Sequence, residues 1–187
     1  MKVLILDNYD SFTYNLFHIV EQFCNNVSVI RNDKIDFSII DRYDKIILSP
    51  GPGLPNDAVS LKELIKKKSS SKTILGVCLG HQALGQVFGL NLINIKNVKH
   101  GEKSVLSEVN KEEVLFQGLN EPIEVGHYHS WVIDEKNNFK DWTVTAKSDD
   151  LIMAISHNTL NLKGVQFHPE SVLTPLGKNM LENWIKS

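Results

Sequence analysis

The alternation of short apolar runs with helical segments in its first half limits the possible folds of this chain more than any other sequence feature. Each run has the length of a strand and ends at polar, glycine or proline positions. The runs cover residues 3–6, 27–30, 45–48 and 73–77. Apolar residues at helical spacing mark the intervening segments, at about 11–23, 61–65 and 80–88. Strands that alternate with helices predict an α/β fold, a doubly wound and mostly parallel sheet covered on both faces.

After residue 90 the pattern changes to short strand-like pieces. They lie at residues 105–108, 123–125, 142–146, 153–156 and 165–167, and a helix is expected at 176–185, after Pro175. Short strands in succession favour an antiparallel extension of the parallel sheet. No Pro/Gly/Ser-rich linker and no fixed-period repeat divides the sequence, so we expect a single domain over residues 1–187.

Composition excludes several classes of protein. The 42% apolar and 22% charged residues are typical of a globular chain and argue against a disordered or fibrous one. The net charge of −2 gives no general attraction to polyanions, so we expect no nucleic-acid partner. The lysine-rich run 66–72 suits a solvated helix end better than a nucleic-acid patch. No apolar run could span a bilayer, the first is too short for a signal peptide, and the two cysteines suit a reducing compartment. We therefore expect a cytoplasmic protein without membrane contact.

One cysteine stands where a predicted strand passes into a predicted helix. Cys78 has glycines two positions before and after it, Gly76 and Gly80. This spacing is typical of a nucleophile elbow, a turn so tight that side chains at the glycine positions would collide with neighbouring elements. The sulfur would lie at the positive end of the following helix, which favours a thiolate, and the amide of Leu79 would be free to bind an oxyanion. The alternative is a buried structural cysteine.

A histidine and a carboxylate follow another predicted strand. His168 and Glu170, separated by Pro169, come directly after the apolar strand-like residues 164–167. Open α/β sheets place their sites at the carboxyl ends of strands, and residues two apart on an extended segment point the same way. A base and the group that orients it need this arrangement. The alternative is a surface pair without a catalytic role.

A third segment combines prolines and glycines after a strand: Ser49-Pro50-Gly51-Pro52-Gly53. Proline has no N–H, so Gly51 and Gly53 are the candidate oxyanion donors after Ser49, and an ordinary strand-to-helix loop is the alternative. We expect no metal site, because no Cys/His pair has the spacing of zinc ligands, although His127 and His129, two positions apart, could form a metal pair.

Taken together, the motifs resemble the class I (triad) glutamine amidotransferases over essentially the whole chain. The matching segments are residues 6–15 (Leu-Asp-Asn-Tyr-Asp-Ser-Phe-Thr-Tyr-Asn), 49–53, 76–82 (Gly-Val-Cys-Leu-Gly-His-Gln), 128–130 (Tyr-His-Ser) and 164–171 (Gly-Val-Gln-Phe-His-Pro-Glu-Ser). The resemblance implies a flavodoxin-like fold with Cys78 as nucleophile, His168 as acid/base and Glu170 as its orienting partner. The substrate-binding residues it implies are Gly51, Pro52, Gly53, Leu79, Gln82, Ser130 and Trp131.

Within this family the motifs look most like the glutaminase component, component II, of anthranilate synthase. That resemblance implies a heteromeric lyase complex of tryptophan biosynthesis, in which this chain hydrolyses L-glutamine and passes ammonia to a chorismate-utilising subunit, component I. It implies no cofactor in this chain and any Mg2+ on the partner. The sequence departs from the pattern at Val59 and Leu90, where relatives commonly carry glycine, and at Glu102.

Several alternatives stay open. The nearest is the glutaminase of aminodeoxychorismate synthase, in the folate pathway, or a subunit that serves both synthases. Those relatives often carry cysteine where this chain has Gly53, which favours anthranilate synthase. A cysteine peptidase or glutamyl hydrolase on the same scaffold, and a flavodoxin-like binding protein without catalysis, are the more distant alternatives.

Overall fold

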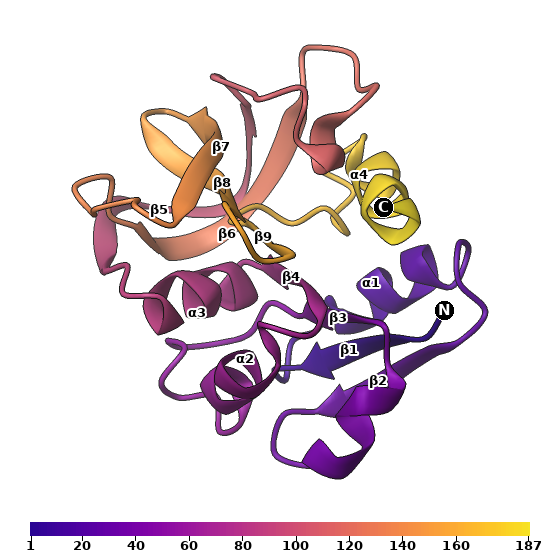
Figure 1. The fold of residues 1–187 in the computed structure, drawn as a ribbon. Coiled ribbons are helices and arrows are strands. Elements are labelled where there is room, and N and C mark those ends of the chain that lie inside the picture. Colours follow the sequence, from indigo (N-terminus) through magenta and orange to yellow (C-terminus); the bar gives the residue numbers. More distant parts are fainter.

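The computed structural model describes residues 1–187 and has a seven-stranded sheet at its centre, in the order β2-β1-β3-β4-β9-β8-β7 (Figure 1). The first five strands in this order run parallel, and the last two are antiparallel to their neighbours. The strands are β1 (Val3–Asp7), β2 (Val27–Arg31), β3 (Lys45–Leu48), β4 (Thr73–Val77), β7 (Trp142–Ser148), β8 (Leu151–His157) and β9 (Leu162–Val165). The expected parallel sheet with an antiparallel extension is confirmed.

Helices cover both faces of the parallel strands. They are α1 (Thr13–Val20) and α4 (Gly177–Lys186) on one face, and α2 (Leu61–Lys68) and α3 (Leu79–Val87) on the other (Figure 1). Strand β1 shows why both layers form. Its Val3 and Ile5 pack with α1 and α4, whereas Leu4 and Leu6 pack with α2 and α3. A strand that is apolar at every position must be covered twice, so the doubly wound architecture follows from the sequence.

A second, two-stranded antiparallel sheet is built from β5 (Leu92–Val105) and β6 (Glu124–Ile133). The expected strand at residues 105–108 is wrong, because β5 ends at Val105, and the strand expected at 123–125 is only the start of β6. Most side chains of β5 are exposed, so the strand carries no apolar alternation that could be detected in the sequence. Two short 3-10 helices, η1 (Phe37–Arg42) and η2 (Val114–Phe116), complete the elements.

Some boundaries also differ from expectation. Helix α1 begins at Thr13 and ends at Val20, inside the expected segment of about residues 11–23. The Asp10 carboxylate accepts a hydrogen bond from the backbone N–H of Phe12, the N-cap residue, at 2.8 Å. Such a local side-chain bond holds a turn ahead of a helix and delays its start. Strand β9 ends at Val165, before the expected limit of residue 167.

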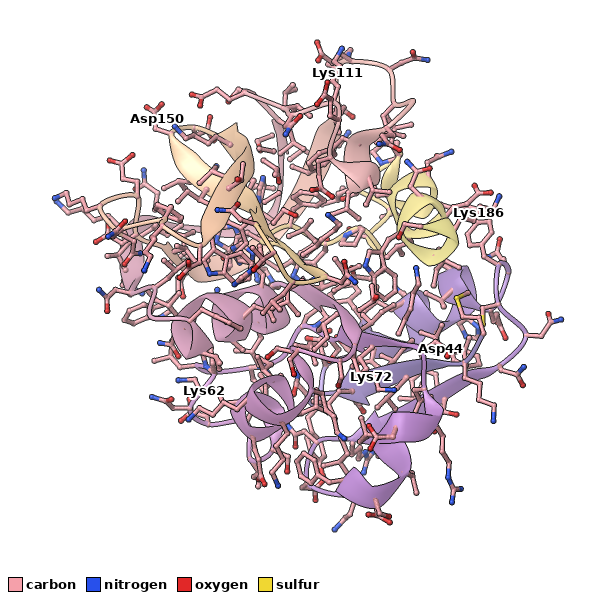
Figure 2. All side chains as sticks on the ribbon, in the orientation of Figure 1. Asp44, Lys62, Lys72, Lys111, Asp150 and Lys186 are labelled. Carbon is pink, nitrogen blue, oxygen red and sulfur yellow. The ribbon has the colours of Figure 1, made fainter.

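The charged surface agrees with the interpretation of the lysine-rich run as a solvated helix end. Lys66 and Lys67 are exposed in the last turn of α2, and Lys67 forms an ion pair with Glu63 at 2.6 Å. Charged side chains such as Lys62, Lys111 and Lys186 lie at the margin of the molecule (Figure 2). No helix has both the length and the apolar character needed to cross a membrane.

Candidate active site

Cys78 lies at the turn between β4 and α3, with the strained backbone angles φ 49° and ψ −100°. A Cβ atom at Gly76 would come within 2.5 Å of the carbonyl carbon and oxygen of Gly80. A Cβ atom at Gly80 would in turn collide with the backbone oxygen of Leu48 in β3. Both glycines are therefore required by backbone contacts, and the predicted elbow is confirmed.

The pair His168 and Glu170 reaches the same edge of the sheet from β9. His168 Nδ1 lies 2.7 Å from Glu170 Oε1, and both side chains are buried. The other ring nitrogen, Nε2, is buried and has no hydrogen-bond partner. His168 and Cys78 line the same cavity. A ring oriented at Nδ1 and open at Nε2 can transfer a proton to or from a ligand beside Cys78.

The protonation of His168 differs from that of the other buried histidines. Burial lowers the pKa of His168, but the Cys78 thiolate, as a hydrogen-bond acceptor and a negative charge, and then Glu170 in the same two ways, raise it well above 6.5. At three other histidines burial is the largest cause and lowers the pKa to about 3 (His81 and His129) and about 4 (His127). The raised pKa favours a proton on the His168 ring, which could pass it to a group leaving from the carbon attacked by Cys78.

The predicted substrate-binding residues surround one cavity of about 180 Å³ beside Cys78. The lining comprises Gly51, Pro52, Gly53, Cys78, Leu79, Gln82 and the β6 residues Tyr128, His129, Ser130 and Trp131. Gln82 Nε2 donates to the Trp131 carbonyl at 2.9 Å and to Gln166 Oε1 at 3.2 Å. Its amide nitrogen is committed to the protein, which leaves its carbonyl oxygen for a ligand.

Three backbone amides can serve an oxyanion at this cavity. The N–H groups of Gly51 and Gly53 donate no hydrogen bond within the chain. Leu79 is the first residue of α3, where an N–H has no intrahelical acceptor. Gly53 has φ 71°, a conformation that favours glycine, so the loop depends on this residue type. The roles of these amides stay predictions, but their position beside the thiol suits them.

Sequence reasoning missed two contributions to the site. Gln166 is fully buried, and its Nε2 lies 3.5 Å from Cys78 Sγ. The signal was available, because Gln166 stands two positions before His168 and so points to the same side. Phe12 and Tyr128 pack edge-on against the His168 ring, with centroids 5.7 Å and 5.0 Å away. These contacts join α1, β6 and β9 and have no local signal.

His127 and His129, the two residues considered as a metal pair, lie side by side on β6. His127 Nδ1 lies 3.2 Å from His129 Nε2, and His127 Nε2 lies 2.6 Å from Ser104 Oγ. The two rings therefore lie within hydrogen-bond distance of each other. No group of three or more His, Cys, Asp or Glu side chains is placed to hold a metal.

We expect iodoacetamide to alkylate Cys78 at least about 10-fold faster than Cys24. Both residues are 6% exposed, but Cys78 borders open cavities, one of which it shares with His168. The Cys24 thiol instead donates to the carbonyl of Met1, at 3.4 Å. Peptide mapping after limited labelling measures the ratio, with Cys24→Ser as the control that keeps the fast site. Label found mainly on Cys24 would contradict the assignment.

Comparisons with known proteins point to one family. The family model for "Glutamine amidotransferase class-I" matches residues 4–187. A Haemophilus influenzae protein named "Putative anthranilate synthase component II" is 38% identical over 99% of this chain and 96% of its own length. A Bacillus subtilis protein named "Aminodeoxychorismate/anthranilate synthase component 2" is 40% identical over 99% and 96%.

Among solved structures, a protein from Thermoplasma acidophilum described as part of a putative GMP synthase is similar in fold, with a TM-score of 0.87 and 27% identity over 100% of this chain and 92% of that one. The family model spans nearly all of the sequence, and the matched proteins span it at about 40% identity. The chain therefore belongs to the class-I glutamine amidotransferase family.

Proposed function

We propose that this chain is the glutaminase subunit of anthranilate synthase, working through a Cys78–His168–Glu170 triad. The observation that carries the proposal is the convergence of a strained cysteine elbow and a histidine oriented by Glu170 on one cavity. The name of the relative from Haemophilus influenzae supports the choice of synthase.

The proposed reaction has two halves. The Cys78 thiolate attacks the side-chain amide carbon of glutamine, and the resulting oxyanion accepts hydrogen bonds from the amides of Leu79 and the Gly51–Gly53 loop. Each such donor contributes about 3–4 kcal/mol in comparable sites. His168 protonates the departing nitrogen, ammonia leaves, and a thioester remains on Cys78. A water molecule, deprotonated by His168, then attacks the thioester and releases glutamate.

Ammonia also needs a route away from the glutamine cavity. A second cavity, of about 410 Å³, meets the first at Cys78 and is also lined by His168, Tyr128, His100 and Tyr9. This cavity supports release past His100 and Tyr9, toward a partner that covers these two residues. We place the chorismate-utilising subunit there and any Mg2+ on that subunit, and we place the complex in the cytoplasm.

A second candidate function is the glutaminase of aminodeoxychorismate synthase. The Bacillus subtilis relative is named for both synthases, so a single protein of this family can carry both names. Co-purification decides between them. We expect tagged wild-type chain, expressed in its source cells, to retain the anthranilate-forming subunit. Recovery of only the aminodeoxychorismate-forming subunit would contradict the proposal.

Glutaminase activity is expected to rise roughly 5–150-fold when the synthase subunit binds, and further with chorismate. A free triad that hydrolysed glutamine without an acceptor would waste nitrogen, so we expect the partner that uses the ammonia to gate the reaction. Docking near residues 51–55, 96–103 and 128–131 could select the loop conformation in which the oxyanion donors point at the substrate. Glutamate release by the isolated chain, with partner, and with partner plus chorismate measures the effect. Equal turnover in all three would contradict gating and leave the triad untouched.

A further inference from the structure

A separate cavity, of about 330 Å³, lies where the strand order of the parallel sheet changes direction. Strands β2 and β3 flank β1 on opposite sides, and open α/β sheets bind ligands in the crevice formed by such a reversal at the strands' carboxyl ends. The lining follows the carboxyl ends of these three strands: Asn8, Tyr9, Asn32, Asp33, Pro52, Asp57, Ala58 and Val59. The proposed reaction uses none of the polar side chains in this cavity.

The cavity offers hydrogen-bond acceptors that the protein leaves free. Asn32 is only 4% exposed, its Nδ2 donates to Asn8 Oδ1 at 3.1 Å, and its carbonyl oxygen has no hydrogen-bond partner. This oxygen is not a fully enclosed atom, so a ligand in the cavity can supply a donor to it. Asp57 Oδ2 accepts from the Leu54 N–H at 2.8 Å, and its other oxygen is also free. The cavity therefore suits a ligand with several N–H donors and a positive charge.

One wall of the cavity is a rigid, exposed aromatic residue. Tyr9 is 50% exposed, has the strained φ of 63°, and donates from its hydroxyl to Asp33 Oδ1 at 2.6 Å. The Arg31 guanidinium already lies 5.0 Å from the centroid of the Tyr9 ring, and Lys34 pairs with the other oxygen of Asp33 at 3.2 Å. Strained residues cluster at functional sites, and tyrosine is enriched among the energetic centres of protein interfaces. The opposite rim carries Val59, an apolar side chain that is 75% exposed.

We propose that this cavity receives an arginine side chain of the synthase subunit. The proposal rests on the function proposed above, which supplies the partner. The aliphatic stem would pack on Ala58 and Val59, and the guanidinium would donate to the free oxygens of Asn32 and Asp57. Arginine fits better than lysine, because its planar head presents several donors in fixed directions to separate acceptors.

The position of the cavity connects docking to catalysis. Tyr9 and Pro52 line both this cavity and the one that contains Cys78 and His168. Asp57 Oδ2 accepts a hydrogen bond from the N–H of Leu54, the residue that directly follows the Gly51–Gly53 loop. An arginine seated against Asp57 and Pro52 therefore restricts the loop that carries the candidate oxyanion donors. This contact gives partner-dependent glutaminase activity a physical route.

The test uses the full chain and its synthase subunit, with a positive or a negative charge introduced at one exposed, uncharged position. Val59→Lys is expected to raise the Kd of the complex at least 10-fold, because it places a cation at the mouth of the cavity. Val59→Glu changes the size of the side chain similarly but is expected to bind at least as tightly as wild type. Val105→Lys, at an exposed valine that lines none of these cavities, is the matched control and is expected to stay within twofold. Asp57→Asn is expected to weaken binding in the same direction as Val59→Lys.

The outcomes separate this proposal from the one on which it rests. Equal weakening by Val59→Lys and Val59→Glu would place Val59 in the interface but overturn a cation receptor. No weakening by either Val59→Lys or Asp57→Asn, in a complex that still makes product from glutamine, would overturn the docking site and leave the proposed function standing. A wild-type chain that binds neither synthase subunit would overturn both.

Discussion

Cys78→Ser is expected to reduce glutamine-dependent synthesis by the complex at least about 10³-fold while ammonia-dependent synthesis stays at the wild-type rate. Serine fits the elbow, so the fold and the docking surface are kept, but its hydroxyl lacks the nucleophilicity of a thiolate beside a protonated histidine. Ammonia supplied in solution bypasses this chain, because the partner carries out the chemistry on chorismate.

Steady-state product formation with glutamine and with ammonium, measured on the same preparation, gives both rates. Cys24→Ser is the matched control, because its thiol lies away from the cavity, and it is expected to keep both activities. Glutaminase turnover of Cys78→Ser within tenfold of wild type would show that Cys78 is not the nucleophile.

Gly80→Ala is expected to destabilise the fold by about 3 kcal/mol or more and to lower glutaminase activity roughly 10²-fold. The added Cβ atom would collide with the Leu48 backbone oxygen and lie 2.6 Å from Leu48 Cβ, and neither can move without shifting β3. Helix α3 would have to move away from the sheet, and the first turn of that helix carries Leu79 beside Cys78.

Gly85→Ala is the matched control within the same helix. Its Cβ atom would meet Ile133 Cδ1 at 2.8 Å, the flexible end of a side chain, and alanine favours the helix by about 1 kcal/mol over glycine. We expect the free energy of unfolding of this variant to stay within about 1 kcal/mol of wild type. Urea unfolding of both variants measures the difference, and equal midpoints would contradict the requirement for glycine in the elbow.

The fold was predictable where burial on both faces left a continuous apolar run. Strands β3 and β4 match their expected limits, because charged or turn residues border them directly. Strand β5 could not be found, since its side chains face solvent and its pairing with β6 depends on contacts between distant residues. Backbone pairing holds such a strand without leaving an apolar pattern.

The site was predictable where local geometry determines chemistry. The glycines around Cys78 and the two-residue spacing of His168 and Glu170 are local signals, and the structure brings the three residues together. The edge-on contacts of Phe12 and Tyr128 with His168 are not local, because they join three elements that meet only in the folded chain.

The origin of the product's nitrogen tests the central claim most directly. The complex of this chain with its synthase subunit is given chorismate, glutamine labelled with 15N at the side-chain amide, and an excess of unlabelled ammonium at a pH where little free ammonia is present. Mass spectrometry is expected to find 15N in anthranilate for the wild type and only unlabelled anthranilate for Cys78→Ser. Unlabelled anthranilate from the wild type, or labelled aminodeoxychorismate in its place, would contradict the account.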